Sequence, residues 1–312
     1  MRLLRQKDNG EFSLTKDFVS NIPTYAILSH TWGDDEDEVT FKDIVEGSGK
    51  SKTGYQKLRF CGEQAAQHGY RYIWVDTCCI DKSNNSELVE ALNSMYQWYK
   101  NAAKCYVYLA DVSTNDVNST RMPAESVEKH LRESRWFRRG WTLQELIAPQ
   151  SAEFFSVNGE RLGDKKSLEQ QIHESTGIPV LALQGKSPSE FTVQERFSWA
   201  ANRETKREED KAYSLLGIFN VFLPLIYGEG QVNAFRRLQE EVDKSVKYIE
   251  YSRMTEERML PSSYDIPFQR NRRFSGRNKI LENLTHRLLV QKKCQKLAIT
   301  GLGGIGKTQV AL

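Results

Sequence analysis

The sequence has very little net charge and few cysteines. Its 44 basic and 41 acidic residues leave a formal charge of only +3, which gives no field strong enough to make nucleic acid the main partner. The five cysteines are odd in number and lack the spacing of a disulfide framework, so they favour a reducing compartment. Because no CxxC or HxxxH pair supports them, we expect no metal site. Cys78 and Cys79 are instead expected to be small buried apolar groups.

Long apolar runs are missing as well. The N-terminus has no apolar core of a signal peptide. The longest apolar stretch, 213–227, is interrupted by serine, glycine, asparagine and proline, and it falls short of the roughly 18–20 residues that a membrane-spanning helix needs. No G-x-S-x-G motif indicates a serine hydrolase. The sequence therefore predicts a soluble, cytoplasmic protein with no membrane span.

Short apolar runs alternate with helical patterns along the first half of the chain. Each run is nearly continuous, as a strand buried on both faces requires. This alternation predicts an α/β fold with a parallel sheet that is covered by helices on both faces, and ligands of such sheets bind beyond the carboxyl ends of the strands. The expected strands are 25–29, 72–75, 105–109 and 153–157. The expected helices run from 55 to Gly69, from 88 to 99 with Ser86 as the cap, and over 134–148.

The second half is patterned differently. Helical spacing dominates from about 165 to 247, and the stretch from about 250 to 275 is polar, rich in arginine and broken by proline. We therefore expect a helical annex packed on the sheet, followed by a linker. The expected annex helices cover 167–175, 193–202, 210–219 and 231–247. The predicted boundaries are 1–160 for the first domain, 161–247 for the annex, 248–275 for the linker and 276–312 for the start of a P-loop domain.

The last residues carry a phosphate-binding motif. Gly301, Gly306, Lys307 and Thr308 match G-x-x-x-x-G-K-[ST], and a strand-like run precedes them. In this motif glycines let backbone N–H groups wrap phosphate, lysine neutralises it and threonine holds magnesium. The motif indicates binding of ATP or ADP with Mg²⁺ in a full-length form. Because the sequence stops at Leu312, we expect only the truncated start of a nucleotide-binding domain.

Several long motifs of the first 245 residues resemble the fungal heterokaryon-incompatibility (HET) domain. They are YAILSHTWG (25–33), YIWVDTCCIDK (72–82), RRGWTLQELIAP (138–149), REEDKAYSLLGIF (207–219) and PLIYGEG (224–230). They match in order and with the expected separation, so the resemblance is specific. It implies a filamentous fungus and a role in non-self recognition that ends in programmed cell death.

The C-terminal segment resembles a second family over about 40 residues. Phe274 to Arg277 and the loop from Gly301 to Thr308 are similar to the start of the NB-ARC domain of NOD-like receptors. The combination implies a fungal counterpart of these innate-immunity receptors. In that arrangement the first domain is the death effector, the nucleotide-binding domain drives self-association, and a missing C-terminal sensor recognises a non-self or effector protein.

The HET domain is in turn similar to the Toll/interleukin-1 receptor (TIR) domain, a flavodoxin-like fold whose enzymes cleave NAD⁺ at the nicotinamide–ribose bond. The residues from Trp141 to Leu146 carry W-x-x-x-E-L, with Thr142 where the TIR pattern has cysteine. The resemblance makes Glu145 the candidate catalytic residue, with NAD⁺ as the substrate and no cofactor in this domain. A carboxylate near the ribose is chemically sufficient for that bond cleavage. The alternative is a solvated glutamate without a role.

Five further residues are candidates for binding the substrate. Ser29, His30 and Trp32 follow the first expected strand, and Asp76 follows the second, where ligands of a parallel sheet bind. Trp141 either stacks on a nicotinamide or adenine ring or belongs to the core. His30 either donates a hydrogen bond to the ligand or ties down its own loop, and Asp76 either contacts a ribose or caps the following loop.

Helical spacing divides the region around Glu145 into two faces. Trp141 and Glu145 lie about 40° apart on the helical wheel, and Leu143 and Ile147 point away from them toward the sheet. We therefore expect Glu145 in a cleft lined by the stretch from Ser29 to Trp32. The rival hypothesis is a non-catalytic signalling module, in which the same aromatic and basic residues recruit a protein partner.

Overall fold

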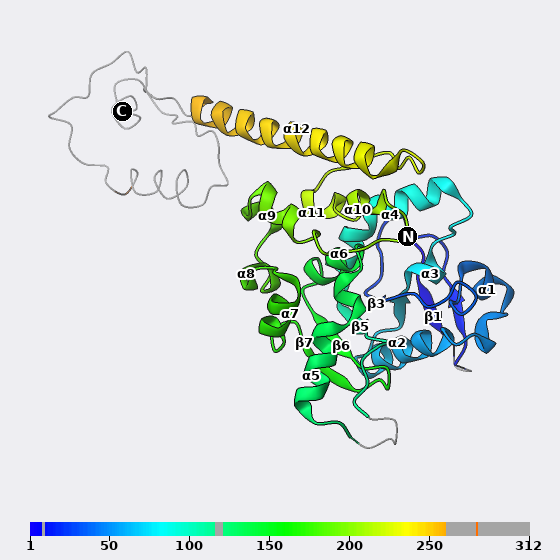
Figure 1. Cartoon of the computed structure of the whole chain (residues 1–312). Coiled ribbons are helices and arrows are strands. Elements are labelled where there is room, and N and C mark those ends of the chain that lie inside the picture. Colours follow the sequence, from blue (N-terminus) through cyan, green and yellow to red (C-terminus); the bar gives the residue numbers. More distant parts are fainter. Residues whose placement is uncertain (8–9, 116–120, 260–278, 280–312) are drawn as a thin grey trace, which may run out of the picture. The chain divides into compact units, whose positions relative to one another are not determined.

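The computed structural model describes residues 1–7, 10–115, 121–259 and 279 of the chain (Figure 1). Met1–Lys247 form one compact unit, and a second unit covers 248–312. Most of the predicted linker 248–275, and the predicted P-loop with Gly301, Gly306, Lys307 and Thr308, lie outside the described residues. No helix in the described part of the chain is long and apolar enough to cross a bilayer.

A seven-stranded mixed sheet forms the centre of the first unit, in the order β2-β1-β4-β3-β5-β6-β7. The α/β prediction is confirmed, but the prediction of an all-parallel sheet is wrong, because β1, β2 and β7 pair antiparallel at the edges. These edge strands carry no continuous apolar run, so the pattern search did not find them. The strands are β1 (Leu4–Gln6), β2 (Phe12–Leu14), β3 (Ala26–His30), β4 (Tyr72–Trp74), β5 (Lys104–Tyr108), β6 (Ala152–Phe155) and β7 (Arg161–Asp164).

The four central strands are parallel, as the sequence predicts. β3 pairs with β4 and with β5, and β5 pairs with β6. In chain order these strands therefore lie second, first, third and fourth across the sheet. The direction in which the chain winds reverses at β3, and such a reversal opens a crevice beyond the carboxyl ends of the strands. His30, the last residue of β3, stands at that crevice.

Helices cover both faces of this sheet. Tyr106 of β5 meets His68, the residue that follows α2, and Tyr108 meets Phe60 of α2, with ring centroids 5.7 and 5.1 Å apart. Cys105, which precedes Tyr106, lies on the other face under α6, because side chains alternate between the faces of a strand. The α-helices before β6 are α1 (Phe41–Glu46), α2 (Tyr55–Gln67), α3 (Asp76–Cys79), α4 (Asn85–Asn101), α5 (Ala124–Glu133) and α6 (Thr142–Ile147). Those after β7 are α7 (Glu169–Thr176), α8 (Val180–Leu183), α9 (Val193–Ser198), α10 (Asp210–Tyr213), α11 (Leu216–Phe219) and α12 (Gly230–Met259).

The predicted helix 88–99 corresponds to α4, but its cap differs from the prediction. The side-chain oxygen of Asn84 accepts hydrogen bonds from the backbone N–H groups of Ser86 and Glu87. Asn84 is therefore the N-cap, and Ser86 lies within the first turn. Both residue types cap helices well, so sequence alone does not separate two candidates that are two positions apart.

The predicted helix 134–148 is interrupted in the middle. A 3₁₀ turn covers Arg135–Arg138, and α6 begins only at Thr142. Between them the backbone N–H of Gly140 donates to Glu204 O at 2.8 Å. A Cβ on Gly140 would lie 2.4 Å from Cγ2 of Thr205. Pairing with a distant segment thus breaks the helix, and only glycine allows so close an approach.

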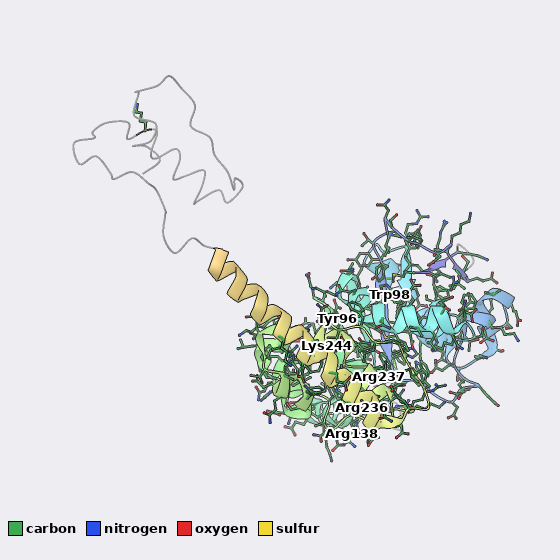
Figure 2. The ribbon with its side chains drawn as sticks, turned by 90° about the horizontal axis from the view of Figure 1, so that it is seen from above. Tyr96, Trp98, Arg138, Arg236, Arg237 and Lys244 are labelled. Carbon is green, nitrogen blue, oxygen red and sulfur yellow. The ribbon has the colours of Figure 1, made fainter. Side chains whose placement is uncertain are left out.

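The annex differs from its predicted helices: α8 was not predicted, α9 ends at Ser198 rather than at 202, and two further helices differ in extent. The expected helix 210–219 is divided into the short helices α10 and α11, and Gly217 of α11 sits where a Cβ would meet Cβ of Tyr96 at 2.1 Å. The last helix, α12, buries a stripe of Ala234, Leu238 and Val242 at four-residue spacing, and Figure 2 shows basic side chains projecting from it. Its backbone continues to Met259, beyond the predicted helix end at 247.

Candidate functional site

A cleft of about 350 Å³ lies at the carboxyl ends of β3 and β4. Five residues predicted from the sequence line it: His30, Trp32, Asp76, Trp141 and Glu145. They come from the end of β3 and the loop after it, the start of α3, and the N-cap and first turn of α6. The structure therefore brings together residues that lie up to 115 positions apart in the chain, at the edge of the sheet where ligands are expected.

Glu145 is an almost fully buried carboxyl group at the inner end of the cleft, with an exposed fraction of 7%. The Ser29 hydroxyl donates a hydrogen bond to its Oε2, and the Trp136 indole N–H donates to Ser29 Oγ at 2.9 Å. Burial raises the pKa of Glu145 to about 8, although the hydrogen bond from Ser29 acts in the opposite direction. At neutral pH the carboxyl group is therefore mainly protonated.

Ser29 differs from the other predicted binding residues. It is completely buried, so its hydroxyl orients Glu145 and is not exposed to a ligand in the cleft. The prediction that Ser29 follows the strand is wrong, because it lies within β3, and the sequence could not show which way its side chain points. Because Ser29 pairs with Val107 across the parallel ladder, it stands on the same sheet face as Cys105, under α6.

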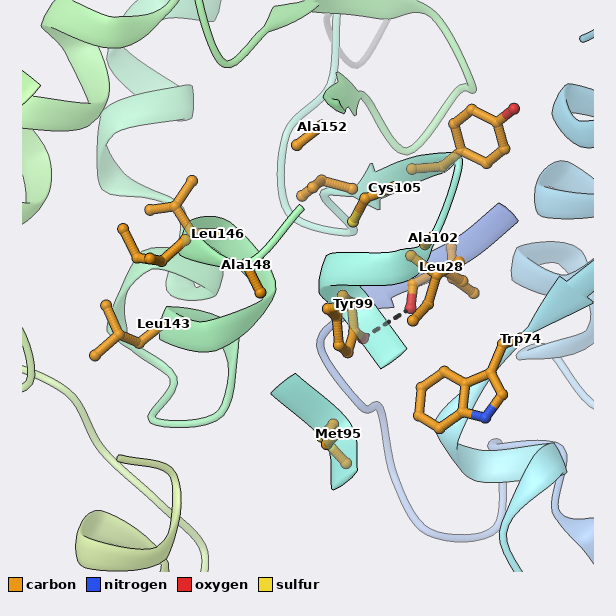
Figure 3. Close-up of a cluster of buried hydrophobic side chains, with 14 of the residues drawn as sticks. Leu28, Trp74, Met95, Tyr99, Ala102, Cys105, Leu143, Leu146, Ala148 and Ala152 are labelled. Carbon is orange, nitrogen blue, oxygen red and sulfur yellow. Dashed lines mark hydrogen bonds between the residues drawn. The ribbon is translucent and has the colours of Figure 1, made fainter. Parts of the chain in front are cut away.

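The helix that carries Glu145 is buried on every side. All of its residues are buried, and Figure 3 shows Leu143 and Leu146 on the side of α6 that faces away from Met95 and Tyr99 of α4. The expected division into a sheet-facing side and a cleft or solvent side is too simple, because Gln144 is also buried. The annex covers the side that a helical wheel assigns to solvent, and only the first turn of the helix remains open to the cleft.

Two buried cations from the annex side hold α6 at its ends. The Arg203 guanidinium donates to Arg139 O at 2.7 Å and to Thr142 Oγ1 at 2.9 Å, just before and at the start of the helix. The Lys165 ammonium donates to Leu146 O at 3.1 Å near the other end. Burial lowers the pKa of Arg203 to about 9 and that of Lys165 to about 8. These contacts fix the helix that positions Glu145.

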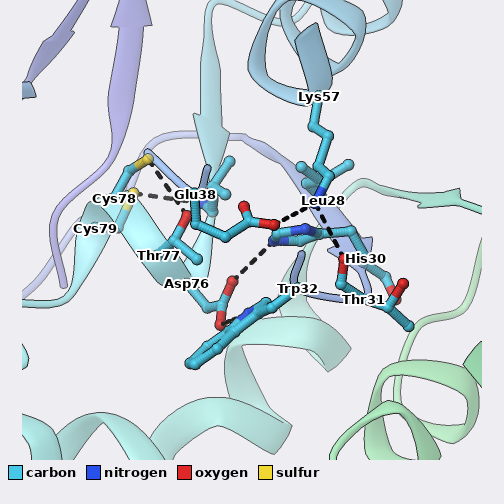
Figure 4. A network of polar contacts seen from close by, with 12 residues as sticks. Leu28, His30, Thr31, Trp32, Glu38, Lys57, Asp76, Thr77, Cys78 and Cys79 are labelled. Atoms are coloured by element: carbon cyan, nitrogen blue, oxygen red, sulfur yellow. Dashed lines mark hydrogen bonds and ion pairs between the residues drawn. The ribbon is translucent and has the colours of Figure 1, made fainter. Parts of the chain in front are cut away.

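A polar network surrounds Asp76 on the opposite side of the cleft (Figure 4). Its Oδ2 accepts from Trp32 Nε1 at 3.0 Å, and its Oδ1 lies 3.2 Å from His30 Nε2. Lys82 Nζ is 3.8 Å from Oδ2. Burial alone would raise the pKa of Asp76, but the charge of Lys82 and the bonds from His30 and Trp32 lower it well below its usual value. Asp76 is therefore ionised, and it ties the loop after β3 to α3.

The annex supplies a wall of the cleft that the sequence analysis did not identify. Asp210 and Tyr227 line the cleft, and the Tyr227 hydroxyl donates to Asp210 Oδ1 at 3.0 Å. The Trp141 indole also hydrogen bonds to Asp210, and the Arg207 guanidinium lies over the Tyr227 ring, 4.1 Å from its centroid. These residues belong to REEDKAYSLLGIF and PLIYGEG, which the sequence analysis noted only as part of the resemblance.

Glu209, the residue before Asp210, contacts the start of α12 instead of lining the cleft. Glu209 Oε1 accepts hydrogen bonds from the backbone N–H groups of Gly228 at 2.7 Å and Gly230 at 3.2 Å. Gly230 is the first residue of α12, so the Glu209 carboxylate satisfies N–H groups at the start of that helix. Two consecutive acidic residues therefore serve two structures, the cleft and the long helix.

The adjacent cysteines are structural, as predicted. Cys78 and Cys79 are buried, and burial raises the pKa of both thiols, to about 12 for Cys79. A buried neutral thiol is neither a good nucleophile nor a good metal ligand. Within the described ranges there is no group of three His, Cys, Asp or Glu residues that could hold a metal ion.

Comparison with known proteins gives a family match and two relatives. The family described as "Heterokaryon incompatibility protein (HET)" matches residues 25–129, a range that contains His30, Trp32 and Asp76 but not Glu145. The vegetative incompatibility protein HET-E-1 of Podospora anserina is 55% identical over 259 residues, which are 83% of this chain and 19% of that protein. No solved structure matches the chain.

A second relative is a nucleotide-binding leucine-rich repeat (NLR)-like protein of Hyaloscypha variabilis. It is 42% identical over 52 residues, which are 16% of this chain and 5% of that protein. The chain thus spans about a fifth of the first relative and a smaller part of the second. The predicted resemblance to the HET domain is confirmed by the family match together with the high identity to HET-E-1: the chain carries a HET domain.

Proposed function

We propose that the cleft binds NAD⁺ and cleaves the bond between nicotinamide and ribose, in a domain with a TIR-like fold. The observation that carries the proposal is Glu145, a buried carboxyl group held by Ser29 at the inner end of a cleft of suitable size. The order of the parallel strands supports the fold, because second-first-third-fourth is the beginning of the flavodoxin-type order.

The proposed reaction needs one carboxylate and water. The bond between C1 of the ribose and the pyridinium nitrogen breaks, and its electron pair neutralises the nicotinamide. The Glu145 carboxylate stabilises the positive charge that develops on the ribose. Water then adds to C1 and loses a proton, which gives ADP-ribose. Because the nicotinamide of NAD⁺ is cationic, its arrival lowers the raised pKa of Glu145 and favours the carboxylate form.

The other residues of the cleft suit the rest of the ligand. Trp141 lines the cleft and offers an indole face for a planar ring, whereas Lys82 lies over one face of the Trp32 ring. Arg139 and Arg207 also line the cleft and can pair with phosphate oxygens. The ionised Asp76 is fully engaged with its neighbours, which assigns it to holding the loop after β3 rather than to the chemistry.

We also propose a biological setting for this activity. The relative HET-E-1 is named a vegetative incompatibility protein, and the second relative is named NLR-like. In this setting the HET domain is an effector of fungal non-self recognition and programmed cell death. A downstream nucleotide-binding domain, with ATP or ADP and Mg²⁺, brings copies of the domain together, and clustering switches on the cleavage of NAD⁺.

The test is NAD⁺ consumption by the full chain, displayed at high density on beads through an affinity tag. The wild type is expected to release nicotinamide, and Glu145→Gln is expected to slow release by at least about 100-fold, as is typical when a stabilising group is removed. Glu63→Gln is the matched control, because this glutamate is 57% exposed on α2. Glutamine has nearly the same shape as a protonated glutamate, so the variant is expected to fold. A melting temperature close to that of the wild type verifies this.

Three outcomes are informative. Release of nicotinamide by wild type and by Glu63→Gln, but not by Glu145→Gln, supports the proposal. If the clustered wild type does not consume NAD⁺, the proposed enzymatic function is wrong. Death of fungal cells that express the clustered chain, with an unchanged NAD⁺ level, would favour a module that recruits partners through the same surface.

A further inference from the structure

A second hollow of about 450 Å³ adjoins the cleft. It lies between α1 and the segment from Thr77 to Ser83, and four residues line both cavities: Trp32, Asp35, Ile80 and Lys82. The two cavities are therefore neighbours that share a wall. The cleft beside Glu145 and the second hollow each have the size of an ordinary small-molecule pocket.

The shared wall carries a fixed aromatic ring and a cation. Trp32 is held in place by the hydrogen bond from its indole N–H to Asp76, and Lys82 Nζ lies 3.6 Å from the centroid of the Trp32 ring. At 3.8 Å from Asp76 Oδ2, the ammonium forms an ion pair too long for a hydrogen bond, so it keeps N–H donors for an anion. The acid on this wall, Asp35, is neutralised by Lys206 at 2.7 Å.

The second hollow has an apolar patch on α1, formed by Phe41 and Val45, and Thr40 and Thr77 add hydroxyl groups. Charged residues also line the hollow: Glu38, which pairs with Lys57, Lys42 and Glu46, which pair with each other, and Asp81. Val45 is 65% exposed, so its side chain is open to a ligand. An apolar patch beside hydroxyl groups suits a purine nucleoside, which has a planar ring and a ribose with hydrogen-bonding hydroxyls.

A dinucleotide has the same three-part order as these cavities: a nucleoside, a pyrophosphate and a second nucleoside. We propose that the second hollow binds the distal nucleoside of a dinucleotide whose nicotinamide riboside lies beside Glu145, with Lys82 holding the pyrophosphate over the shared wall. The inference rests on the proposed function, since it takes the dinucleotide to be the substrate. It adds a binding site for the distal nucleoside and the pyrophosphate, formed by α1 and Lys82, which lies away from the nicotinamide–ribose bond.

The discriminating variant is Val45→Glu, which places a charged side chain on the apolar side of the hollow. Val19→Glu is the matched control, because this valine is 94% exposed and does not line either cavity. Affinities for ADP-ribose and nicotinamide mononucleotide are measured by calorimetry, and KM for NAD⁺ by turnover. Val45→Glu is expected to weaken ADP-ribose binding and to raise KM by at least about tenfold.

The same variant is expected to leave kcat and the affinity for nicotinamide mononucleotide unchanged, because that ligand lacks the distal nucleoside. Lys82→Gln is expected to weaken ADP-ribose binding as well, with a smaller dependence of the remaining affinity on salt. Unchanged ADP-ribose affinity in Val45→Glu, or no binding of ADP-ribose by the wild type, would overturn the inference. Tight binding of ADP-ribose to the hollow without any turnover of NAD⁺ would contradict the proposed function instead, so the two failures are distinguishable.

Discussion

Two carboxyl groups face the same cleft and have opposite charge states. Asp76 is surrounded by Lys82 and by donors from His30 and Trp32, so its pKa is lowered well below the usual value. Glu145 is buried beside an apolar cluster with the Ser29 hydroxyl, and its pKa is raised to about 8. The difference lies mainly in the partners, since the Asp76 side chain is only 17% exposed and Glu145 is 7% exposed. An acid with positively charged partners, such as Asp76, stays ionised and holds its neighbours in place. An acid whose hydrogen-bond donors are all neutral, such as Glu145, can change its protonation state near neutral pH.

The largest expected effect is the loss of folding stability when the Asp76 carboxylate is removed. Asp76→Ala leaves the Trp32 indole N–H and His30 without their acceptor, so the free energy of unfolding should fall by about 4 kcal/mol. Asp35→Ala, at a carboxylate that is 74% exposed, should change it by less than about 1 kcal/mol. Urea unfolding at neutral pH measures both. Equal losses for the two variants would show that Asp76 does not hold its neighbours in place.

A smaller effect should appear in the pH dependence of stability. The pKa of Glu145 is about 8 when folded and near 4.5 when unfolded. Between these values the folded protein holds a proton that the unfolded chain has released, so stability falls as pH rises. Wild type should therefore lose roughly 3 kcal/mol relative to Glu145→Gln between about pH 5 and pH 8.

Asp76 should not contribute to this decrease of stability with rising pH. Its folded pKa is lowered, so its contribution is complete above the unfolded value of 3.8 and is lost only as pH falls through the acid range. Unfolding of wild type and Glu145→Gln by urea at several pH values separates the two acids. Parallel stability curves for the two proteins above pH 5 would mean that Glu145 does not carry the raised pKa.

The smallest effect concerns the annex wall. Asp210→Asn removes the charge that accepts from Tyr227 and Trp141 but retains one acceptor oxygen, so KM for NAD⁺ should rise by about threefold with kcat unchanged. Asp243→Asn on the exposed face of α12 is the control. Steady-state kinetics measures both variants. A loss of kcat at constant KM would place Asp210 with Glu145 in the chemistry instead of with the wall.

The fold was predictable where local sequence determines it. The four central strands are continuous apolar runs, and the long stripes of α2 and α4 are visible at helical spacing. The antiparallel edge was not predictable in this way, because Leu4 pairs with Leu14 and Ile73 across short, partly polar strands. The break of the predicted helix at Gly140 depends on the close approach of Thr205, which is 65 positions away in the chain. The residue spacing around Gly140 therefore does not indicate this break.

The candidate site was predictable only in part, for a related reason. Strand ends and the W-x-x-x-E-L pattern led to His30, Asp76 and Glu145, and the structure places these residues around one cleft. The function of each remains a prediction. Asp210 and Tyr227 were missed, because their place at the cleft follows from how the annex packs on α6 and not from their own neighbours in the chain. Ser29 was found, but its orientation follows from the register of β3 against β5.

The neighbouring acids Glu209 and Asp210 have a mechanical consequence. One carboxylate grips the first turn of α12, and the next residue along the backbone forms part of the cleft wall. One peptide unit joins the two residues. A shift of the first turn of α12 is therefore expected to act on the wall of the cleft through the Glu209 side chain and this peptide unit, without an intervening loop.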